Sequence, residues 1–359
     1  MKIVFLITSL GGGGAERVVC NLSNYLHSKA EDVSITAIRG GATTYNLDAN
    51  IKVTYLQEDY YNTPTTLKRR LEEIRKVYNF LHSKGRGHTI VCFLELPVAY
   101  ALIFKPFVNA KVIICERNNP EFYSKSYQKL YKLLADRADM CVCQTNVIAN
   151  WYRKIISNDS RIKVIPNSIN QSILDSPTGN RSKKEIVTMA RLAPQKNQRM
   201  LIEAFAEIVN SHPDYSLTIY GEGPLREELT SLAESLKVSD KVKFPGFTKD
   251  VIGVLSTASM FVMTSDHEGM PNALAEAMAM GVPCVSTDCG GGGARELIDN
   301  GKNGLLIPCR DKEALVNAMK SILEDQAKAN AISKEAVKIR QRLDPDFIHS
   351  QWRDLFQHH

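Results

Sequence analysis

The sequence predicts an α/β protein built of two tandem doubly wound, Rossmann-like domains. Its 359 residues are the length of about two ordinary domains. Short runs rich in β-branched residues alternate with longer amphipathic patterns, which is typical of parallel sheets covered by helices on both faces. No apolar run approaches the roughly 18 residues of a membrane-spanning helix, so we do not expect an integral membrane protein.

The first predicted domain spans residues 1–166. Its opening run, Met1–Ile7, is too short for the apolar part of a secretion signal, and we expect a buried first strand there. The expected strands are residues 2–8, 33–38, 51–56, 89–94, 111–116 and 139–144. The expected helices are residues 15–29, 66–83, 97–105, 124–137 and 146–156.

A polar stretch at 167–184, poor in core-forming residues, is the predicted linker. The alternation restarts in a second predicted domain at 185–343. Its expected strands are residues 186–190, 215–220, 241–244, 260–263, 283–287 and 304–307. Its expected helices are residues 197–211, 224–236, 250–257, 272–281, 294–299, 311–325 and 328–342. A last helix within 344–359 can cross back to the first domain. Because such sheets bind ligands at the carboxyl ends of their strands, the expected site is the cleft between the two domains.

The cysteines indicate the compartment in which the protein works. The eight cysteines include no C-x-x-C pair and lie mostly in apolar runs, which indicates buried thiols, a reducing compartment and no zinc site. We therefore expect a cytoplasmic protein.

The net charge of +6 comes from residues 61–160, which carry 16 basic and 8 acidic residues. Such an excess suits nucleic acid, acidic headgroups or a diphosphate-linked lipid, and a solvated helix face is the plain alternative.

One helix of the basic segment has a marked apolar stripe. Leu67, Leu71, Ile74, Tyr78 and Leu81 recur at helical spacing, and basic residues flank them. The stripe either packs on the sheet of its own domain or helps the basic face to dock on an anionic membrane.

Two glycine-rich segments follow predicted strands. In Gly11–Gly14, before Glu16, the backbone N–H groups can approach an anion at a helix start. The segment is not a G-x-G-x-x-G motif with a ribose-binding acid about 20 residues later, so a nicotinamide cofactor is disfavoured. A flexible turn is the alternative reading. Gly290–Gly293 resembles a second phosphate-facing turn.

The segment from Glu268 to Gly281 has the strongest chemical pattern. Pro271 suits the first position of a helix, which places Glu268 just before the helix and Glu276 inside an almost wholly apolar run. A buried carboxylate needs a partner, and the N–H groups of residues 272–274 are available to an anion at the helix start. The pattern favours a diphosphate flanked by hydroxyl groups, with an amphipathic surface helix as the alternative.

Arg191 and Lys196 follow the first strand of the second domain. Two fixed cations beside a diphosphate can neutralise a leaving group without a metal. We therefore expect no metal and no cofactor. Taken alone, this segment is more often a surface loop than a site.

In order and spacing, these motifs resemble the retaining family 4 glycosyltransferases of the GT-B fold, in particular those that extend polyprenyl-diphosphate-linked saccharides. The resemblance rests on Glu268-x7-Glu276, on Arg191 with Lys196, on Tyr220-Gly221-Glu222-Gly223-Pro224, on Val242-x-Phe244-Pro245-Gly246, and on Gly13-Gly14-Ala15-Glu16-Arg17. It covers nearly the whole chain and is specific for the superfamily but weak for the particular sugar.

The resemblance implies a role for each motif residue. Arg191 and Lys196 would hold the donor diphosphate, and Glu268 would contact the transferred sugar. The residues implied at the nucleotide are Gly13, Gly14, Gly221, Pro245, Gly246, Phe247, Asn272, Ala273, Leu274 and Glu276, the last at the ribose. The candidate contacts to acceptor or sugar are Glu16, Glu116, Arg117, Asn118 and His267.

The chain departs from the family at one position. Many relatives carry a histidine after the strand that corresponds to 111–116, whereas this chain reads Glu116-Arg117-Asn118. No residue resembles a covalent nucleophile. The implied reaction is therefore a same-face attack in which the leaving diphosphate oxygen takes the proton of the acceptor.

The preferred function is transfer of a hexose or N-acetylhexosamine from a UDP-sugar to a polyprenyl-diphosphate-linked saccharide, in surface polysaccharide or glycan assembly. The implied partners are the nucleotide sugar, the lipid-linked acceptor and the anionic inner membrane surface, with no nucleic acid. The enzyme would be cytoplasmic and peripheral at that membrane face. The alternatives are a UDP-sugar 2-epimerase-like enzyme and an inactive sugar-nucleotide-binding subunit.

Overall fold

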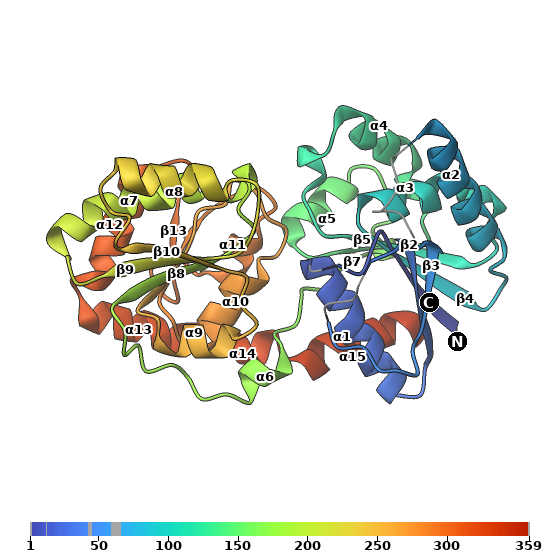
Figure 1. Cartoon of the computed structure of the whole chain (residues 1–359). Coiled ribbons are helices and arrows are strands. Elements are labelled where there is room, and N and C mark those ends of the chain that lie inside the picture. The colour runs from blue at the N-terminus through green and yellow to red at the C-terminus, as the bar shows by residue number, and fades with distance from the viewer. Residues whose placement is uncertain (1, 12, 42–44, 59–65, 358–359) are drawn as a thin grey trace. The chain divides into compact units, whose positions relative to one another are not determined.

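The computed structural model describes residues 2–11, 13–41, 45–58 and 66–357 (Figure 1). The chain divides into two compact units. Unit 1 comprises Met1–Ser168 and Asp346–His359, and unit 2 comprises Ile169–Pro345. Each unit is a parallel sheet covered on both faces by helices, so the predicted fold class of two Rossmann-like α/β domains is confirmed.

Unit 1 contains a seven-stranded parallel sheet in the order β3-β2-β1-β4-β5-β6-β7. The strands are β1 (Lys2–Ile7), β2 (Asp32–Arg39), β3 (Lys52–Gln57), β4 (His88–Phe93), β5 (Lys111–Glu116), β6 (Met140–Cys143) and β7 (Ile162–Val164). The helices are α1 (Gly14–Ser28), α2 (Leu67–His82), α3 (Glu95–Phe104), α4 (Lys125–Leu134), α5 (Asn146–Tyr152) and α15 (Pro345–Gln357). Each face of the sheet has its own hydrophobic core. Helices α2 to α5 cover one face, and α1 and α15 cover the other (Figure 1).

Unit 2 contains a six-stranded parallel sheet in the order β10-β9-β8-β11-β12-β13. The strands are β8 (Glu185–Met189), β9 (Ser216–Tyr220), β10 (Val242–Gly246), β11 (Met260–Met263), β12 (Cys284–Thr287) and β13 (Leu305–Ile307). The helices are α6 (Gln171–Leu174), α7 (Gln198–Ser211), α8 (Arg226–Ser235), α9 (Val251–Thr257), α10 (Asn272–Ala279), α11 (Gly293–Leu297), α12 (Lys312–Leu323), α13 (Gln326–Ala336) and α14 (Ile339–Arg342). Helices α7, α8 and α12 pack on one face, and α9, α10 and α11 pack on the other.

Shorter features complete the chain. Single 3-10 turns occur at η2 (Lys105–Phe107), η3 (Pro120–Phe122), η4 (Ala135–Arg137), η5 (Asp159–Arg161) and η6 (Pro194–Lys196). Several helices are preceded by a residue whose side chain accepts a hydrogen bond from a backbone N–H of the first helical turn. Examples are Thr66 before α2 and Asp311 before α12. Among the described residues, no helix combines the length and the apolar character that crossing a bilayer requires.

The structure differs from the predicted elements at four points. Strand β7 and helix α6 were not expected, because three and four residues are too few to establish a periodicity. The helix expected at 328–342 is broken into α13 and α14. The guanidinium of Arg340 donates to the carbonyls of Ala279, Leu174 and Ser176, so tertiary bonds anchor α14 to α10 and to the segment around α6. Pro271 lies just before α10 as its N-cap and is not its first residue.

The strand orders locate one switch point in each sheet. In unit 1 the chain builds outward from β1 in one direction and from β4 in the other, so the switch point lies between β1 and β4. In unit 2 it lies between β8 and β11. Ligands of doubly wound sheets bind at the carboxyl ends of the strands at such a point.

Candidate functional site

The two loops at the switch point of unit 2 are fastened to each other. One loop follows β8 and contains Gln195 and Lys196, and the other follows β11 and contains Asp266, His267 and Glu268. The amide of Asp266 donates to the carbonyl oxygen of Gln195 at 2.8 Å, and Gln195 Nε2 donates to the carbonyl oxygen of His267 at 2.6 Å. The loops therefore form one continuous surface at the carboxyl edge of the sheet.

An ion pair also joins the two loops. Lys196 Nζ lies 2.5 Å from Glu268 Oε1, and the two side chains are 20% and 12% exposed. A charge-assisted contact between partly buried groups is stronger than an exposed one, because solvent screens it less. A cation for an anionic group and a carboxylate for a hydroxyl group thus stand side by side.

Helix α10 begins directly after the Glu268 loop. Its N-terminal turn, Asn272 to Leu274, follows Pro271, which has no side chain that could cap it. A helix start carries partial positive charge and suits an anion. Glu276 lies one turn into α10 and is buried, 4% exposed, as its apolar sequence surroundings predicted. The helix therefore offers backbone N–H donors and a buried carboxylate on the same short element.

Four more predicted nucleotide residues, Gly221, Pro245, Gly246 and Phe247, lie at or just after the ends of β9 and β10, on the same carboxyl edge. Gly221 has φ +137°, and a Cβ there would lie 2.0 Å from the carbonyl oxygen of Ala190. Only glycine allows this close approach between the loops after β8 and β9. Pro245 is exposed, Gly246 is buried with φ +89°, and Phe247 presents a largely exposed ring next to them. Arg191 is exposed beyond the end of β8.

The run Gly290–Gly293 supports the Glu268 loop. A Cβ at Gly291 would lie 1.7 Å from the carbonyl oxygen of Glu268, and one at Gly293 would lie 1.8 Å from that of Gly269. The amide of Glu268 also donates to the carbonyl oxygen of Gly290 at 3.0 Å. The glycines thus let the loop after β12 pack directly against the backbone that carries Glu268.

His267 pairs through its backbone with Gly290 and precedes the carboxylate. Burial lowers the pKa of the His267 imidazole, although the neighbouring Glu268 acts in the opposite direction. A lowered pKa keeps the ring neutral at pH 7, so that it offers one donor and one acceptor.

In unit 1, the glycine segment lies at the switch point of the sheet. Gly13 is the N-cap of α1, and Gly14 is exposed at its first position. A Cβ at Gly13 would lie 2.1 Å from Glu16 Oε2, so the Glu16 carboxylate folds back over the helix start. Burial raises the pKa of the Glu16 carboxyl. The unit therefore has its own helix start and carboxyl group at the edge where ligands of such sheets bind.

The last residue of β5 and the two residues after it are mostly enclosed within unit 1. Glu116 is fully buried, accepts a hydrogen bond from the Tyr123 hydroxyl at 3.0 Å, and has its pKa raised by burial to about 8. The Arg117 guanidinium lies 4.5 Å from the Phe93 ring centre and donates to Asn167 Oδ1 at 2.8 Å. Burial lowers the pKa of Arg117 to about 10. Of the three predicted residues in this segment, only Asn118 is partly exposed.

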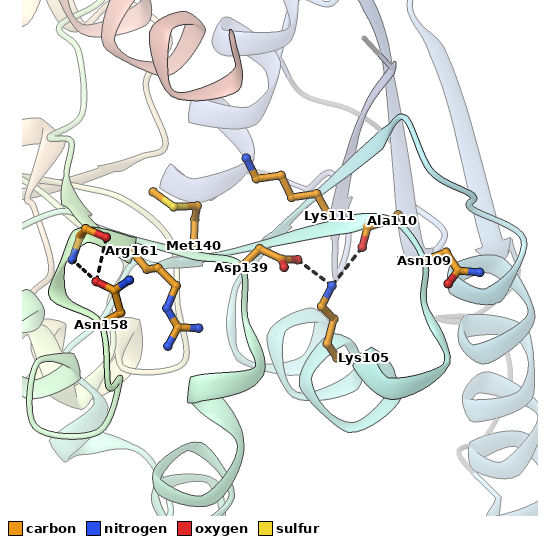
Figure 2. A pocket seen from close by; sticks show the side chains of 9 residues that line it. Lys105, Asn109, Ala110, Lys111, Asp139, Met140, Asn158 and Arg161 are labelled. Carbon is orange, nitrogen blue, oxygen red and sulfur yellow. Dashed lines mark hydrogen bonds and ion pairs between the residues drawn. The ribbon is translucent and has the colours of Figure 1, made fainter. Parts of the chain in front are cut away.

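A cavity of about 520 Å³ lies elsewhere, at the amino-terminal ends of β5 and β6 (Figure 2). Lys105 Nζ lies 2.6 Å from Asp139 Oδ2 on one side of it. Figure 2 shows Lys111 and Met140 pointing away from that pair. None of the predicted site residues lines this cavity, and its side chains do not converge on one point. It is therefore distinct from the carboxyl-edge sites.

Sequence reasoning missed the residues that fasten the Glu268 loop. Thr264 Oγ1 donates to the carbonyl oxygen of Lys196 at 3.0 Å, and Thr287 Oγ1 donates to that of Ser265 at 2.6 Å. Arg310, in the loop after β13, donates to Asp266 Oδ2 at 2.7 Å. No sequence motif connects these residues. Within the described residues, no group of three His, Cys, Asp or Glu side chains is placed to hold a metal ion.

Comparison with protein families gives two adjoining matches. Residues 12–172 match the model described as Glycosyltransferase Family 4, and residues 171–339 match the model described as Glycosyl transferases group 1. The boundary between the two matches lies close to the boundary between units 1 and 2.

The chain is also similar to individual proteins, over different shares of their lengths. The chain is 28% identical over 365 residues to a Campylobacter jejuni GalNAc-alpha-(1->4)-GalNAc-alpha-(1->3)-diNAcBac-PP-undecaprenol alpha-1,4-N-acetyl-D-galactosaminyltransferase, covering 99% of this chain and 98% of that protein. It is 33% identical over 226 residues to an exopolysaccharide phosphotransferase of Streptomyces coelicolor, covering 62% of this chain but only 24% of that protein. The structure of Anabaena HepE in complex with UDP-glucose has the same fold, with a TM-score of 0.86 at 22% identity over the whole of both chains.

Proposed function

The chain belongs to the family 4 glycosyltransferases of the GT-B fold, and on this premise we propose that it transfers a hexose or an N-acetylhexosamine from a UDP-sugar to a lipid-linked saccharide, with retention of configuration. The observation that carries the proposal is the Lys196–Glu268 pair at the switch point of unit 2, next to the start of α10. A positive charge, a helix start and two carboxylates meet the needs of a sugar joined to a diphosphate.

In the proposed donor complex, Arg191, Lys196 and the start of α10 hold the diphosphate. Glu276 accepts hydrogen bonds from the ribose, because its buried carboxylate lies one turn deeper in the same helix. Glu268 accepts from hydroxyl groups of the transferred sugar. Gly221 and the exposed Phe247 border the base. That HepE was solved with UDP-glucose supports uridine as the nucleoside.

The proposed reaction needs no covalent intermediate. The bond between the sugar C1 and the diphosphate oxygen breaks while C1 bonds to the acceptor oxygen on the same face. The acceptor proton passes to the leaving diphosphate oxygen, and UDP is released. Lys196 and Arg191 stabilise the negative charge that grows on the diphosphate, which is most effective where water is excluded. Positioning of the two substrates provides much of the remaining acceleration.

The proposed acceptor is a saccharide on a polyprenyl diphosphate. The name of the Campylobacter jejuni relative describes transfer to an undecaprenol-linked saccharide. Gly13, Gly14 and Glu16 lie at the carboxyl edge of unit 1 with the partly exposed Asn118, and we place acceptor contacts there. Such an acceptor resides in a bilayer, so the enzyme must reach a membrane surface.

The helical layer of unit 1 formed by α2, α3 and α4 is the proposed membrane-docking face, at the cytoplasmic side. Helix α3 packs beside both α2 and α4. Leu67 and Leu71 of α2 are 75% and 59% exposed, and Leu133 of α4 is exposed as well. Exposed basic residues occur on the same two helices, at positions 68, 70 and 75 of α2 and at positions 125, 129 and 132 of α4. Apolar and basic side chains on one face are the combination that binds an anionic bilayer.

A donor screen tests the proposal. UDP-sugars should raise the thermal midpoint, because a ligand at 100 times its dissociation constant adds about 2.7 kcal/mol of stability. The same screen on Glu276→Ala should show a much smaller shift. If no UDP-linked compound raised the thermal midpoint, the donor assignment would be contradicted. Conversion of a UDP-sugar to its 2-epimer would identify an epimerase.

A further inference from the structure

The geometry of Lys196 and Glu268 depends on what holds two irregular loops. Both residues lie beyond the ends of their strands, β8 and β11, where no ladder of sheet hydrogen bonds fixes the backbone. Side chains on loops are placed less firmly than side chains on strands unless other contacts hold them. The distance between Lys196 Nζ and Glu268 Oε1 is therefore set by contacts elsewhere in these loops.

Asp266 provides such contacts from a position two residues before Glu268. Its Oδ2 accepts from Arg310 Nε at 3.1 Å and from Arg310 Nη2 at 2.7 Å. Its Oδ1 lies 3.5 Å from Asn197 Nδ2, at the outer limit of a hydrogen bond. Its amide donates to the carbonyl oxygen of Gln195 at 2.8 Å. Asp266 is thereby bonded to the loop after β8 and to the loop after β13.

Two of the partners have unusual backbone conformations. Asn197 has φ +46° and Arg310 has φ +60°, which is the left-handed region that side chains with a Cβ rarely adopt. Asparagine tolerates this region, whereas arginine gains nothing from it locally. Such strain persists where surrounding contacts over-determine the backbone, and it gathers at functional sites. Arg310 accordingly holds its strained conformation while it binds Asp266.

The Asp266 carboxylate is engaged by protein donors. Its side chain is 20% exposed and that of Arg310 is 75% exposed; Arg310 binds Oδ2, and Asn197 Nδ2 lies 3.5 Å from Oδ1. It is therefore suited to hold the loops and not to contact a substrate. Lys196 precedes Asn197 in sequence, and Glu268 follows Asp266 by two residues, so a shift at Asp266 moves both members of the ion pair.

We propose that Asp266, Asn197 and Arg310 form a positioning clamp that sets the distance and orientation of Lys196 and Glu268. This inference rests on the proposed function, because it assigns the clamp to turnover of the same site. The clamp supports catalysis through the positions of these two residues. UDP binding in the proposed site also draws on Arg191 and the start of α10, so loss of the clamp should affect turnover more than UDP affinity.

Three variants and one control test the clamp. Asp266→Asn removes the charge, Arg310→Ala removes the guanidinium at an equally strained position, and Arg310→Lys keeps a cation. The control is Asp214→Asn, which breaks the Lys184–Asp214 pair of 2.8 Å near the amino end of β8. The measurements are kcat, UDP affinity, thermal midpoint, and amide hydrogen exchange of residues 264–271, which reports local opening.

Asp266→Asn and Arg310→Ala should lower kcat about tenfold or more, because small misplacements of reacting groups have large kinetic effects. UDP affinity should change by less than about threefold, the exchange of 264–271 should accelerate, and Arg310→Lys should recover part of kcat. The control should leave all four measurements unchanged. An unchanged kcat in both Asp266→Asn and Arg310→Ala, or parallel losses of kcat and UDP affinity, would overturn the clamp.

Failure of the proposed function gives a different result. In that case the wild-type protein neither binds UDP nor transfers sugar, and the amide hydrogen exchange of residues 264–271 is the measurement that tests the clamp. Faster exchange in Asp266→Asn but not in Asp214→Asn then supports the clamp as the element that orders the loop, and equal exchange in all variants refutes it.

Discussion

Among single residues, the two carboxylates of the α10 region have different surroundings and therefore different expected roles. Glu268 lies in a loop with Lys196 2.5 Å away, whereas Glu276 is buried inside the helix. The proposed site uses this difference, with Glu268 at the sugar and Glu276 at the ribose.

Replacement of the two carboxylates should separate binding from turnover. Glu276→Ala should weaken UDP binding about tenfold or more, since a hydrogen bond to a charged group contributes about 1.5–3 kcal/mol. Glu268→Ala should leave UDP affinity nearly unchanged and lower kcat about a hundredfold, as loss of a transition-state contact does. Calorimetric titration with UDP and steady-state kinetics measure both. Glu234→Ala, on the exposed face of α8, is the control. Unchanged UDP affinity in Glu276→Ala would refute the ribose role.

Glu116 should give the unfolding free energy a distinct pH dependence. Its pKa is raised by burial to about 8 from 4.5, so the folded state retains a proton that the unfolded chain releases. This stabilisation is complete below the unfolded pKa and is lost as pH rises through the folded pKa. Glu116→Gln lacks the titration, so its stability relative to the wild type should increase between about pH 5 and about pH 8.5. Urea unfolding at both values measures it, and a difference independent of pH would show that Glu116 is ionised in the fold.

The candidate site residues that sequence reasoning singled out belong to compact motifs, and the loop-fastening residues that it missed do not. Glu268 and Glu276 are eight positions apart around one helix start, so their spacing alone placed them near each other. Asp266 and Arg310 are 44 positions apart and meet only because β11, β12 and β13 are neighbours in the sheet. The burial of Arg117 between the Phe93 ring and Asn167 likewise depends on tertiary packing.

At the level of elements, α2 shows what periodicity can and cannot predict. Its helical stripe was expected, and α2 is a helix from Leu67 to His82. The stripe is nevertheless not uniform: Leu81 is buried, whereas Leu67 and Leu71 face solvent. The buried face instead includes Glu73, which accepts from Arg39 Nε at 3.0 Å and from the Tyr100 hydroxyl at 2.9 Å. A carboxylate can be buried when it is paired, and the sequence of α2 alone does not reveal partners on β2 and α3.

The exposed part of α2 should bind anionic vesicles. Each Lys or Arg near an acidic leaflet contributes about 1 kcal/mol, so changing Lys68, Arg70 and Arg75 to Gln should weaken binding about a hundredfold at low salt. Leu71→Ser should weaken it further by removing apolar contact. Co-sedimentation with vesicles containing anionic lipid measures binding, which should fall as salt rises.

The control for this experiment is a triple change to Gln at exposed lysines of unit 2, at positions 237, 302 and 334. This control alters the net charge equally and should retain vesicle binding. Vesicle binding that does not change with salt concentration would contradict a docking face on α2. An equal loss of binding in both triple variants would contradict it as well.

At the scale of the whole molecule, the doubly wound architecture was predictable because each unit repeats one local pattern. Strand and helix runs alternate along the chain, and parallel strands with helical crossovers follow from that alternation. The positions of the switch points come from the strand orders, which the sequence did not provide. Helix α15 was predicted as a helix, and its Trp352 packs with Phe93 in the core of unit 1.

Divalent metal should be dispensable for the reaction. In the proposed site Arg191 and Lys196 provide the positive charge that a metal would otherwise supply to the diphosphate. Turnover should be nearly unchanged when excess EDTA is added and should not rise when Mg²⁺ or Mn²⁺ is restored. A strict requirement for either ion would contradict this assignment of charge.

Sugar transfer to a lipid-linked acceptor is the reaction that the proposed site must perform. The enzyme is incubated with a panel of UDP-hexoses and UDP-N-acetylhexosamines and a saccharide on a polyprenyl diphosphate, and UDP release and the product anomer are measured. We expect UDP release that depends on the lipid-linked acceptor, and a new linkage with the same anomeric configuration as the donor. An inverted linkage, or no transfer to the acceptor from any donor that the protein binds, would contradict it.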